Sequence, residues 1–238
     1  MRHPVRTAIL VDGGFVIKRY RAIHGAATPR SPNVIASDLF SYAIEHLDRD
    51  DRGYGTFKHR GRELYRIFFS DCPPLSNRAH NPLTGRSVDF SKTPEARFRK
   101  ALHHELKCKR KLALRLGRLS KVASWTIPPA KIKQLLRRKI AISDLSDSDV
   151  RYAAKQKGVD IRIGLDTASL ALKRQVDQIV LISGDADFVP AAKLARREGI
   201  DFVLDPMWQK IPEDLLEHID GLRSTAPKPH TRDGPGKQ

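Results

Sequence analysis

The chain has 238 residues, of which 40% are hydrophobic, and it carries a net charge of +17 with a pI near 10.2. It is long enough for a packed core and has no apolar run approaching a membrane span, and its N-terminus lacks the apolar segment of a signal peptide, so we expect a cytoplasmic protein that does not bind membranes. The positive charge predicts a polyanionic partner, and the spacing of Cys72 and Cys108 indicates neither a zinc site nor a disulfide.

The first predicted element is a buried strand over residues 7–11, which leads into Asp12. Gly13 and Gly14 follow and permit a tight turn and a close backbone approach to a ligand. The next expected elements are a helix over 15–23, a helix over 33–47 and a strand over 63–69. Asp71 follows that second strand, where it is either a further site residue or a turn residue before two prolines.

A basic, largely helical insertion is predicted from about residue 73 to residue 156. It begins with a Pro- and Asn-rich loop, and basic helices are expected over 93–111 and 128–139, with a further helix ending near 157. The pattern over 112–125 fits either a strand pair or an extended segment. Between Arg97 and Lys139 fifteen basic residues face one acid, Glu105. A solvated face normally mixes both signs, so this segment favours binding to the phosphates of a nucleic acid.

The final third has the alternation of strands and helices that is typical of a parallel α/β sheet. Strands are predicted over 160–165, 178–182 and 200–204, and helices over 166–174, 190–199 and 212–219. The tail over 224–238 is rich in Pro and Gly and is expected to be disordered. We therefore predict one domain over residues 1–223.

Four aspartates lie at or just beyond the ends of predicted strands: Asp12, Asp166, Asp185 and Asp187. In open α/β sheets, ligands bind beyond the carboxyl ends of the strands. Carboxylates brought together there repel one another unless a cation neutralises them, which favours Mg²⁺ or Mn²⁺. The alternative is that each Asp only caps the helix after it; for Asp187 both roles remain open.

The chain resembles the bacterial NYN domain family, the LabA-like branch of the PIN-like nucleases, in three runs of residues: Val11-Asp12-Gly13-Gly14-Phe15, Lys157-Gly158-Val159-Asp160 and Ser183-Gly184-Asp185-Ala186-Asp187-Phe188-Val189-Pro190. The resemblance implies a Rossmann-like (PIN-like) three-layer sandwich around a mainly parallel sheet, and Mg²⁺- or Mn²⁺-dependent hydrolysis of RNA phosphodiester bonds. It implies catalytic and metal-binding roles for Asp12, Asp166, Asp185 and Asp187, and a further metal-binding role for Asp160. The chain departs from the family at Gly14, because many members carry an Asn shortly after the first Asp.

The predicted function is therefore that of a metal-dependent ribonuclease. Its RNA-binding residues are expected to be Lys18, Arg19, Arg110, Lys111, Arg115, Arg137, Arg138 and Lys139. Phe98, Trp125 and Tyr152 either pack in the core or stack on unpaired bases. One alternative is an inactive RNA-binding module of the same fold. A second is a haloacid-dehalogenase-like phosphatase, which requires an Asp at the position of Gly14.

Overall fold

The structure is a computed structural model that describes residues 3–25, 30–48 and 61–229. Its elements in chain order are β1 Val5–Asp12, α1 Gly13–His24, α2 Pro32–Glu45, β2 Arg62–Asp71, β3 Arg78–His80, β4 Ser87–Asp89, the 3₁₀ turn η1 Phe90–Lys92, α3 Pro94–Lys107, β5 Leu112–Leu116, β6 Arg118–Thr126, α4 Pro129–Leu136, the 3₁₀ turns η2 Ile142–Asp144 and η3 Asp147–Asp149, β7 Arg151–Lys157, α5 Val159–Leu172, β8 Gln178–Ile182, the 3₁₀ turn η4 Ala186–Phe188, α6 Val189–Arg197, β9 Asp201–Asp205, α7 Glu213–Leu216 and β10 Gly221–Leu222.

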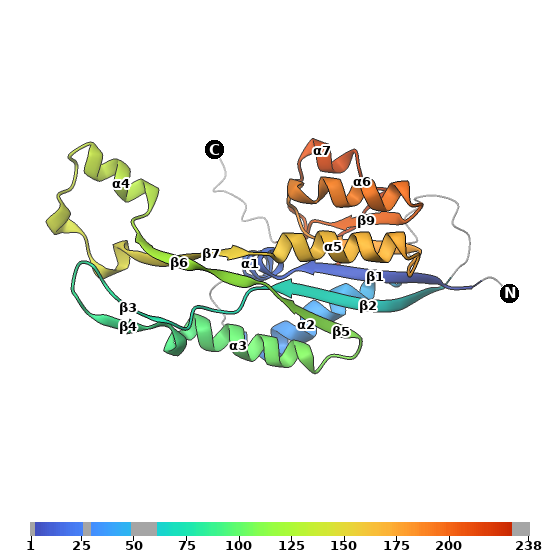
Figure 1. The fold of residues 1–238 in the computed structure, drawn as a ribbon, viewed down its shortest axis with the longest axis horizontal. Helices are drawn as coiled ribbons and strands as arrows, with labels where there is room; N and C mark the ends of the chain where they lie inside the picture. Colours follow the sequence, from blue (N-terminus) through green and yellow to red (C-terminus); the bar gives the residue numbers. More distant parts are fainter. Residues whose placement is uncertain (1–2, 26–29, 49–60, 230–238) are drawn as a thin grey trace, which may run out of the picture.

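The centre of the fold is a six-stranded sheet in the order β10-β9-β8-β1-β2-β5, in which every neighbouring pair is parallel. Helices cover both faces, as Figure 1 shows. The predicted three-layer α/β fold with a parallel sheet is therefore confirmed.

Alternate residues of the central strands face two separate hydrophobic clusters. Ile9 and Val11 of β1 pack in the cluster with α1, α2 and α3, whereas Ala8 and Leu10 pack in the cluster with α5, α6 and α7. A strand buried on both faces reads as a continuous apolar run, which explains why β1 and β8 were predictable from sequence. Each strand places every second side chain on the opposite helical layer.

The chain leaves β1 and β8 in opposite directions. From β1 it passes through α1 and α2 to β2 on one side, and from β8 it passes through α6 to β9 on the other. The helices that follow these two neighbours therefore cover opposite faces. Strand order reverses between β1 and β8, and ligands bind at such a reversal, beyond the carboxyl ends of the strands.

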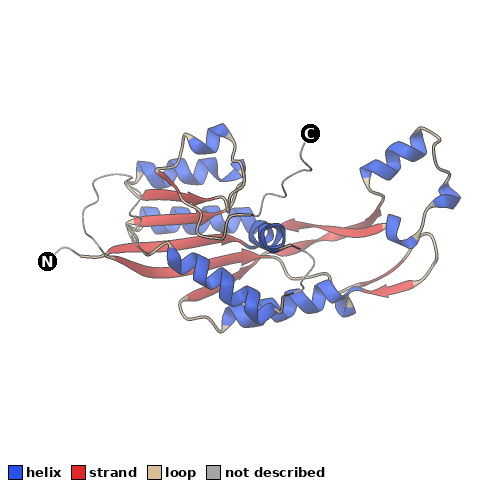
Figure 2. Ribbon diagram, turned by 180° about the vertical axis from the view of Figure 1, so that it is seen from behind, coloured by secondary structure: helices blue, strands red, loops and turns tan. Residues whose placement is uncertain are grey.

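An antiparallel ribbon of β6 and β7 extends beyond the carboxyl end of the sheet and carries α4 at its far end, with the β3–β4 hairpin alongside (Figures 1 and 2). We call β6, α4 and β7, residues 118–157, the arm. At its root, Gly117 N–H donates a 2.7 Å hydrogen bond to the carbonyl of Asp71 at the end of β2. A Cβ on Gly117 would lie 2.7 Å from the carbonyl oxygen of Lys157, so the root has no space for a side chain there.

Two predicted elements have the wrong type. The segment predicted as a helix ending near residue 157 is strand β7, because its cross-strand pairing with β6 overrides the helix propensity of its Ala, Lys and Gln residues. Residues 160–165, predicted as a strand, lie in helix α5. The apolar residues that alternate in this segment are not buried together in the helix: Ile163 is buried, whereas Ile161 and Leu165 are exposed. Short apolar runs do not distinguish strand from helix.

The basic segment over 73–156 is not a largely helical insertion separate from the core. Its strand β5 is the edge strand of the central sheet, and Leu102 and Leu106 of α3 are fully buried in the core. The start of the predicted disordered tail is also packed: Ala226 is buried, and its carbonyl accepts a hydrogen bond from the indole of Trp208. The rest of that tail, from residue 230, lies outside the described residues. Among the described helices, none is both long and apolar enough to cross a membrane.

The turn after β1 generates a test with a matched control. A Cβ on Gly13 would lie 2.6 Å from the ring of Phe69 and 2.9 Å from the carbonyl oxygen of Ser70, whereas the nearest atom to a Cβ on Gly14 would be 3.5 Å away. Gly13→Ala should therefore destabilise the protein by about 1–3 kcal/mol, because the buried strand cannot move aside. Gly14→Ala should be neutral or slightly stabilising, since Ala favours a helix. Urea denaturation of both variants checks this; equal stabilities would contradict the packing described.

Candidate functional site

Asp12 lies at the carboxyl end of β1, at the point where strand order reverses. Its Oδ1 accepts a 3.1 Å hydrogen bond from the backbone N–H of Phe15, so it caps α1, and its Oδ2 accepts a 3.4 Å hydrogen bond from the buried Ser183 hydroxyl. Burial raises the pKa of Asp12 to about 6, and the negative charge of Asp160 adds to this effect. The hydrogen bonds counter only part of it. Capping is thus one role of Asp12, but it does not satisfy the carboxylate fully.

The loop after β8 contributes Asp185 and Asp187 on the other side of this reversal. Asp185 Oδ1 accepts a 3.1 Å hydrogen bond from the backbone N–H of Asp187 and thereby caps η4. Asp187 has an exposed side chain and is not the capping residue of α6, because the N-cap position of that helix is Phe188, which makes no side-chain hydrogen bond. Two roles were left open for Asp187, a metal ligand or a helix cap, and the structure does not support the cap.

Asp160 joins this group from the first turn of α5. Loss of solvation, followed by the negative charges of Asp185 and Asp187, raises the pKa of Asp160. The charge of Asp160 thus interacts with those of Asp12, Asp185 and Asp187, and we call these four carboxylates the acidic edge. Within the described part of the chain, none of the four forms an ion pair with Lys, Arg or His.

The donor chemistry of the acidic edge fits a hard divalent cation. Among the described residues, no three His, Cys, Asp or Glu side chains lie close enough to hold one metal ion together. Mg²⁺ does not require such a cage, because it is usually bound by one or two carboxylates, several waters and the phosphates of a substrate. Uncompensated oxygen ligands at Asp12 and at the 185–187 loop meet that requirement.

The structure does not bring Asp166 to the acidic edge. Its prediction as a ligand came from a strand expected to end at residue 165 and from the family resemblance. Asp166 lies instead six residues along α5 from Asp160, about 9 Å along the axis. There both carboxylate oxygens accept hydrogen bonds from the guanidinium of Arg115, at 3.1 and 2.5 Å. An Asp neutralised in this way is an ion-pair partner, so we exclude it from the proposed site.

Asp71, at the end of β2, forms a buried charged cluster that the sequence did not predict. Arg99 Nη1 donates to both of its oxygens, at 2.8 and 2.7 Å, and His103 Nε2 lies 2.7 Å from Oδ2. Burial alone would raise the pKa of Asp71, but the hydrogen bond from His103 and the charge of Arg99 outweigh it and lower the pKa. Asp71 is therefore an anion already satisfied by α3. Only the helical spacing of Arg99 and His103 offered a hint of this pairing.

Several predicted RNA-binding residues have other partners. Arg19 donates to the carbonyl of Met207 at 3.1 and 2.7 Å, Arg115 pairs with Asp166, and Lys111 Nζ donates to the carbonyl of Leu64. Lys111 and Arg110 also precede β5 and so lie at the amino edge of the sheet, opposite the acidic edge. The remaining predicted residues are exposed: Lys18 on α1 and Arg137, Arg138 and Lys139 after α4.

The pairing of β6 with β7 brings basic side chains together on one face of the arm. Side chains alternate across β7, so Arg151, Lys155 and Lys157 share one side with Arg118, which is paired with Lys157 on β6. All four are exposed. The other face of the ribbon carries Trp125 and Tyr152, which are paired with each other across the strands. Of the aromatics considered for base stacking, Phe98 instead packs against the core.

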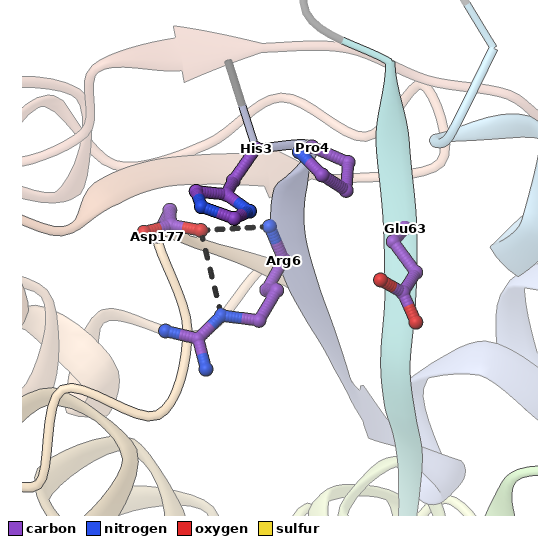
Figure 3. A pocket seen from close by; sticks show the side chains of 5 residues that line it. All are labelled: His3, Pro4, Arg6, Glu63 and Asp177. Carbon is purple, nitrogen blue, oxygen red and sulfur yellow. Dashed lines mark hydrogen bonds and ion pairs between the residues drawn. The ribbon is translucent and has the colours of Figure 1, made fainter. Parts of the chain in front are cut away.

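Two cavities flank opposite edges of the sheet. The larger, of about 480 Å³, lies at the amino edge between His3, Pro4, Arg6, Glu63 and Asp177 (Figure 3). Its Asp177 is bonded to the backbone N–H of Arg6 at 2.8 Å, and the residues lie at the beginnings of β1, β2 and β8. The smaller, of about 390 Å³, lies between α3 and the arm, on the side of the acidic edge. The second cavity is the better candidate for part of the functional site, because it lies on the side of the acidic edge although it is smaller.

One protein family matches part of the chain. The family model described as the NYN domain matches residues 108–221. This confirms the resemblance to the NYN family for that stretch, while β1 lies outside the matched region and the LabA-like branch remains a prediction. A crystal structure of a protein of unknown function from Vibrio parahaemolyticus is similar at 16% identity and a TM-score of 0.47, over 93% of each chain. No curated protein matches the chain significantly.

The unfavourable environment of Asp12 generates a stability prediction. Because its folded-state pKa is about 6 against an ordinary value of 3.8, its ionisation destabilises the fold progressively as pH rises from about 4 to 6, and the whole cost is present above that window. Asp12→Asn keeps a good helix cap and removes the charge. Without divalent metal at pH 7, the variant should be more stable than the wild type by roughly 1–3 kcal/mol.

Chemical denaturation in EDTA at pH 4 and pH 7 measures this difference, which should shrink at pH 4. Asp166→Asn changes the net charge identically but removes a partner of Arg115, so it should be less stable than the wild type at pH 7. An Asp12→Asn variant that is less stable at pH 7 would contradict the assigned environment.

Proposed function

We propose that the protein, whose residues 108–221 match the NYN domain family, is a metal-dependent ribonuclease that hydrolyses RNA phosphodiester bonds at the acidic edge. The observation that carries the proposal is a set of carboxylates without cationic partners among the described residues, gathered where strand order reverses, beside an exposed basic ribbon. A fold retains such repulsion when a bound cation relieves it.

Asp12 and Asp185 are the residues we propose as principal metal ligands, with Asp160 and Asp187 adding negative charge or ligand oxygens. Mg²⁺ or Mn²⁺ held there would polarise a phosphate and lower the pKa of a water molecule. The side chains themselves keep the site anionic and aligned. Ser183 fixes Asp12 through its hydroxyl, and the cap from Asp185 holds the loop that presents Asp187.

A serine nucleophile is not supported at this site. The Ser183 side chain is fully buried, and its hydroxyl donates to a carboxylate rather than to a histidine. Nucleophilic serine requires an adjacent base that is itself oriented by a third group. The surrounding carboxylates instead suit the activation of water.

The basic face of the arm supports RNA as the polyanion. The arm that carries this face extends beyond the carboxyl ends of the central strands, the end of the sheet at which the acidic edge lies (Figure 1). Its lysines and arginines contact phosphates, which supplies affinity without reading sequence. A non-catalytic RNA-binding module has the same ribbon, and only cleavage distinguishes the two.

Cleavage of a labelled single-stranded RNA in Mn²⁺ or Mg²⁺ tests the proposal directly. The wild type should cleave RNA, lose activity in EDTA and leave para-nitrophenyl phosphate intact. Asp12→Asn and Asp185→Asn should each reduce the cleavage rate about 10²-fold or more, because a metal ligand contributes several kcal/mol to the transition state.

Asp166→Asn is the matched control, since it makes the same chemical change outside the acidic edge and should retain cleavage within a few-fold. Binding of RNA without metal-dependent cleavage would identify an RNA-binding module instead. Hydrolysis of para-nitrophenyl phosphate would identify a phosphatase, and equal activity in Asp12→Asn and wild type would remove the acidic edge from the mechanism.

The arm's role in binding generates a second test. Reversing Arg151, Lys155 and Lys157 to Glu should weaken RNA binding about equally for all sequences. The slope of log K against log salt should also flatten, by about 0.7 for each phosphate of a single strand that the protein no longer neutralises. Fluorescence anisotropy at several salt concentrations, without divalent metal, measures both.

The same change in net charge at the amino edge provides the control. Lys107, Arg110 and Lys173 are exposed and lie next to the beginnings of β5 and β8, away from the arm. Reversing these three should leave the salt slope nearly unchanged. Equal losses of affinity in both triple variants would mean that overall charge, and not the ribbon, binds RNA.

A further inference from the structure

The cavity beside the acidic edge has the size and lining of a small-molecule site. It occupies about 390 Å³ between the N-terminal part of α3, the segment after β2 and the inner face of the arm. Pockets that bind drug-sized ligands and cofactors usually begin at about 300 Å³. This one therefore accommodates a group the size of one nucleobase with part of its sugar.

Flat apolar groups form one part of the cavity wall. Phe90 and Tyr152 both line it, and their rings are stacked with centroids 4.8 Å apart and planes inclined by 19°. Trp125 packs against both rings, with its ring centroid 6.2 Å from that of Phe90 and 5.2 Å from that of Tyr152. The hydroxyl of Tyr152 accepts a 2.9 Å hydrogen bond from the side-chain amide of Asn77. The aromatic wall is thus held on two sides before any ligand arrives.

The charged groups of the cavity already neutralise one another. Arg99 bonds to the buried Asp71 and lies 3.4 Å from Glu95, which also pairs with Arg21 at 3.0 Å. No cation of this cavity is therefore left for a phosphate, and the carboxylate of Glu95 would repel one. An uncharged ligand suits the lining better than an anion.

Gln156, the penultimate residue of β7, connects this cavity to the acidic edge. Its side chain lines the cavity, and its Oε1 lies 3.8 Å from the position that a Cβ of Gly14 would occupy. Asp12 Oδ1 lies 3.5 Å from that same position. The side chain of Gln156 makes no hydrogen bond to the described residues, so its carboxamide is available both to donate and to accept.

We propose that this cavity binds one unpaired base of the RNA strand, next to the phosphate that would lie at Asp12. The proposal rests on the function proposed above. A base is planar and uncharged, which matches the aromatic wall and the neutralised charges. The carboxamide of Gln156 pairs with the polar edge of the base, as Asn and Gln side chains do with exposed base edges. A base within a duplex is excluded, because the base must leave its stack to enter.

Abasic scanning tests the proposal without requiring cleavage. A single-stranded oligoribonucleotide of about 12 nucleotides is made with one abasic position at a time, and its binding is measured in EDTA. For the wild type, an abasic residue at one position should weaken binding about 5- to 100-fold, and those at other positions should have little effect. A duplex of the same sequence should bind without this position dependence.

Ala154→Phe fills the cavity from its floor and should remove the position dependence, as should Gln156→Ala in part. Lys155→Ala is the control on the opposite face of the ribbon; it should weaken all oligonucleotides equally and keep the sensitive position. Absence of any sensitive position in the wild type overturns the proposal, as does a sensitive position that persists in Ala154→Phe.

The two proposals fail in distinguishable ways. RNA binding with one sensitive position but no metal-dependent cleavage leaves the base pocket in place and overturns the ribonuclease activity. Cleavage without a sensitive position overturns the pocket alone. If the wild type binds no RNA, both proposals fail.

Discussion

The parallel pairing of β1 with β8 determines where the candidate site lies in this protein. Val11 lies opposite Ile182 in register, so Asp12 and the 183–187 loop emerge at the same end of two adjacent strands. The helices that follow these strands cover opposite faces of the sheet. Loss of solvation raises the pKa values of Asp12 and Asp160 at this edge, and this energetic cost is the basis of the proposed cation site.

The root of the arm is tied to the end of β2 by a buried charged cluster. The arm begins after Gly117, whose N–H is bonded to Asp71, and Asp71 is in turn held by Arg99 and His103 of α3. This buried cluster therefore fixes the ribbon relative to the end of β2. Removing Asp71 would take this partner from the buried His103 and would leave Arg99 paired with Glu95 alone.

The confirmed strand predictions came from segments whose apolar residues are also the residues buried in the structure. Strands β1, β2, β8 and β9 are short apolar runs bounded by polar residues or Gly, and all four lie within two residues of their predicted ranges or cover them. The candidate residues Asp12, Asp185 and Asp187 directly follow such strands, so the parallel sheet brings them together. The predictions that failed, at residues 151–157 and 160–165, concern half-exposed segments whose pattern fits either element type.

The sequence by itself determined the α/β class, the central strands, the excess of positive charge and three of the four carboxylates of the acidic edge, because each depends on local composition or on a position directly after a buried strand. The fourth, Asp160, was named only through the family resemblance. Tertiary structure decided the rest. It placed Asp160 in the first turn of a helix and paired Asp166 of the same helix with Arg115, since a helix turns residues six apart toward different neighbours. It also placed the basic residues of the arm and those of the amino edge at opposite ends of the sheet. Strand pairing between segments far apart in the sequence decides which side chains share a face.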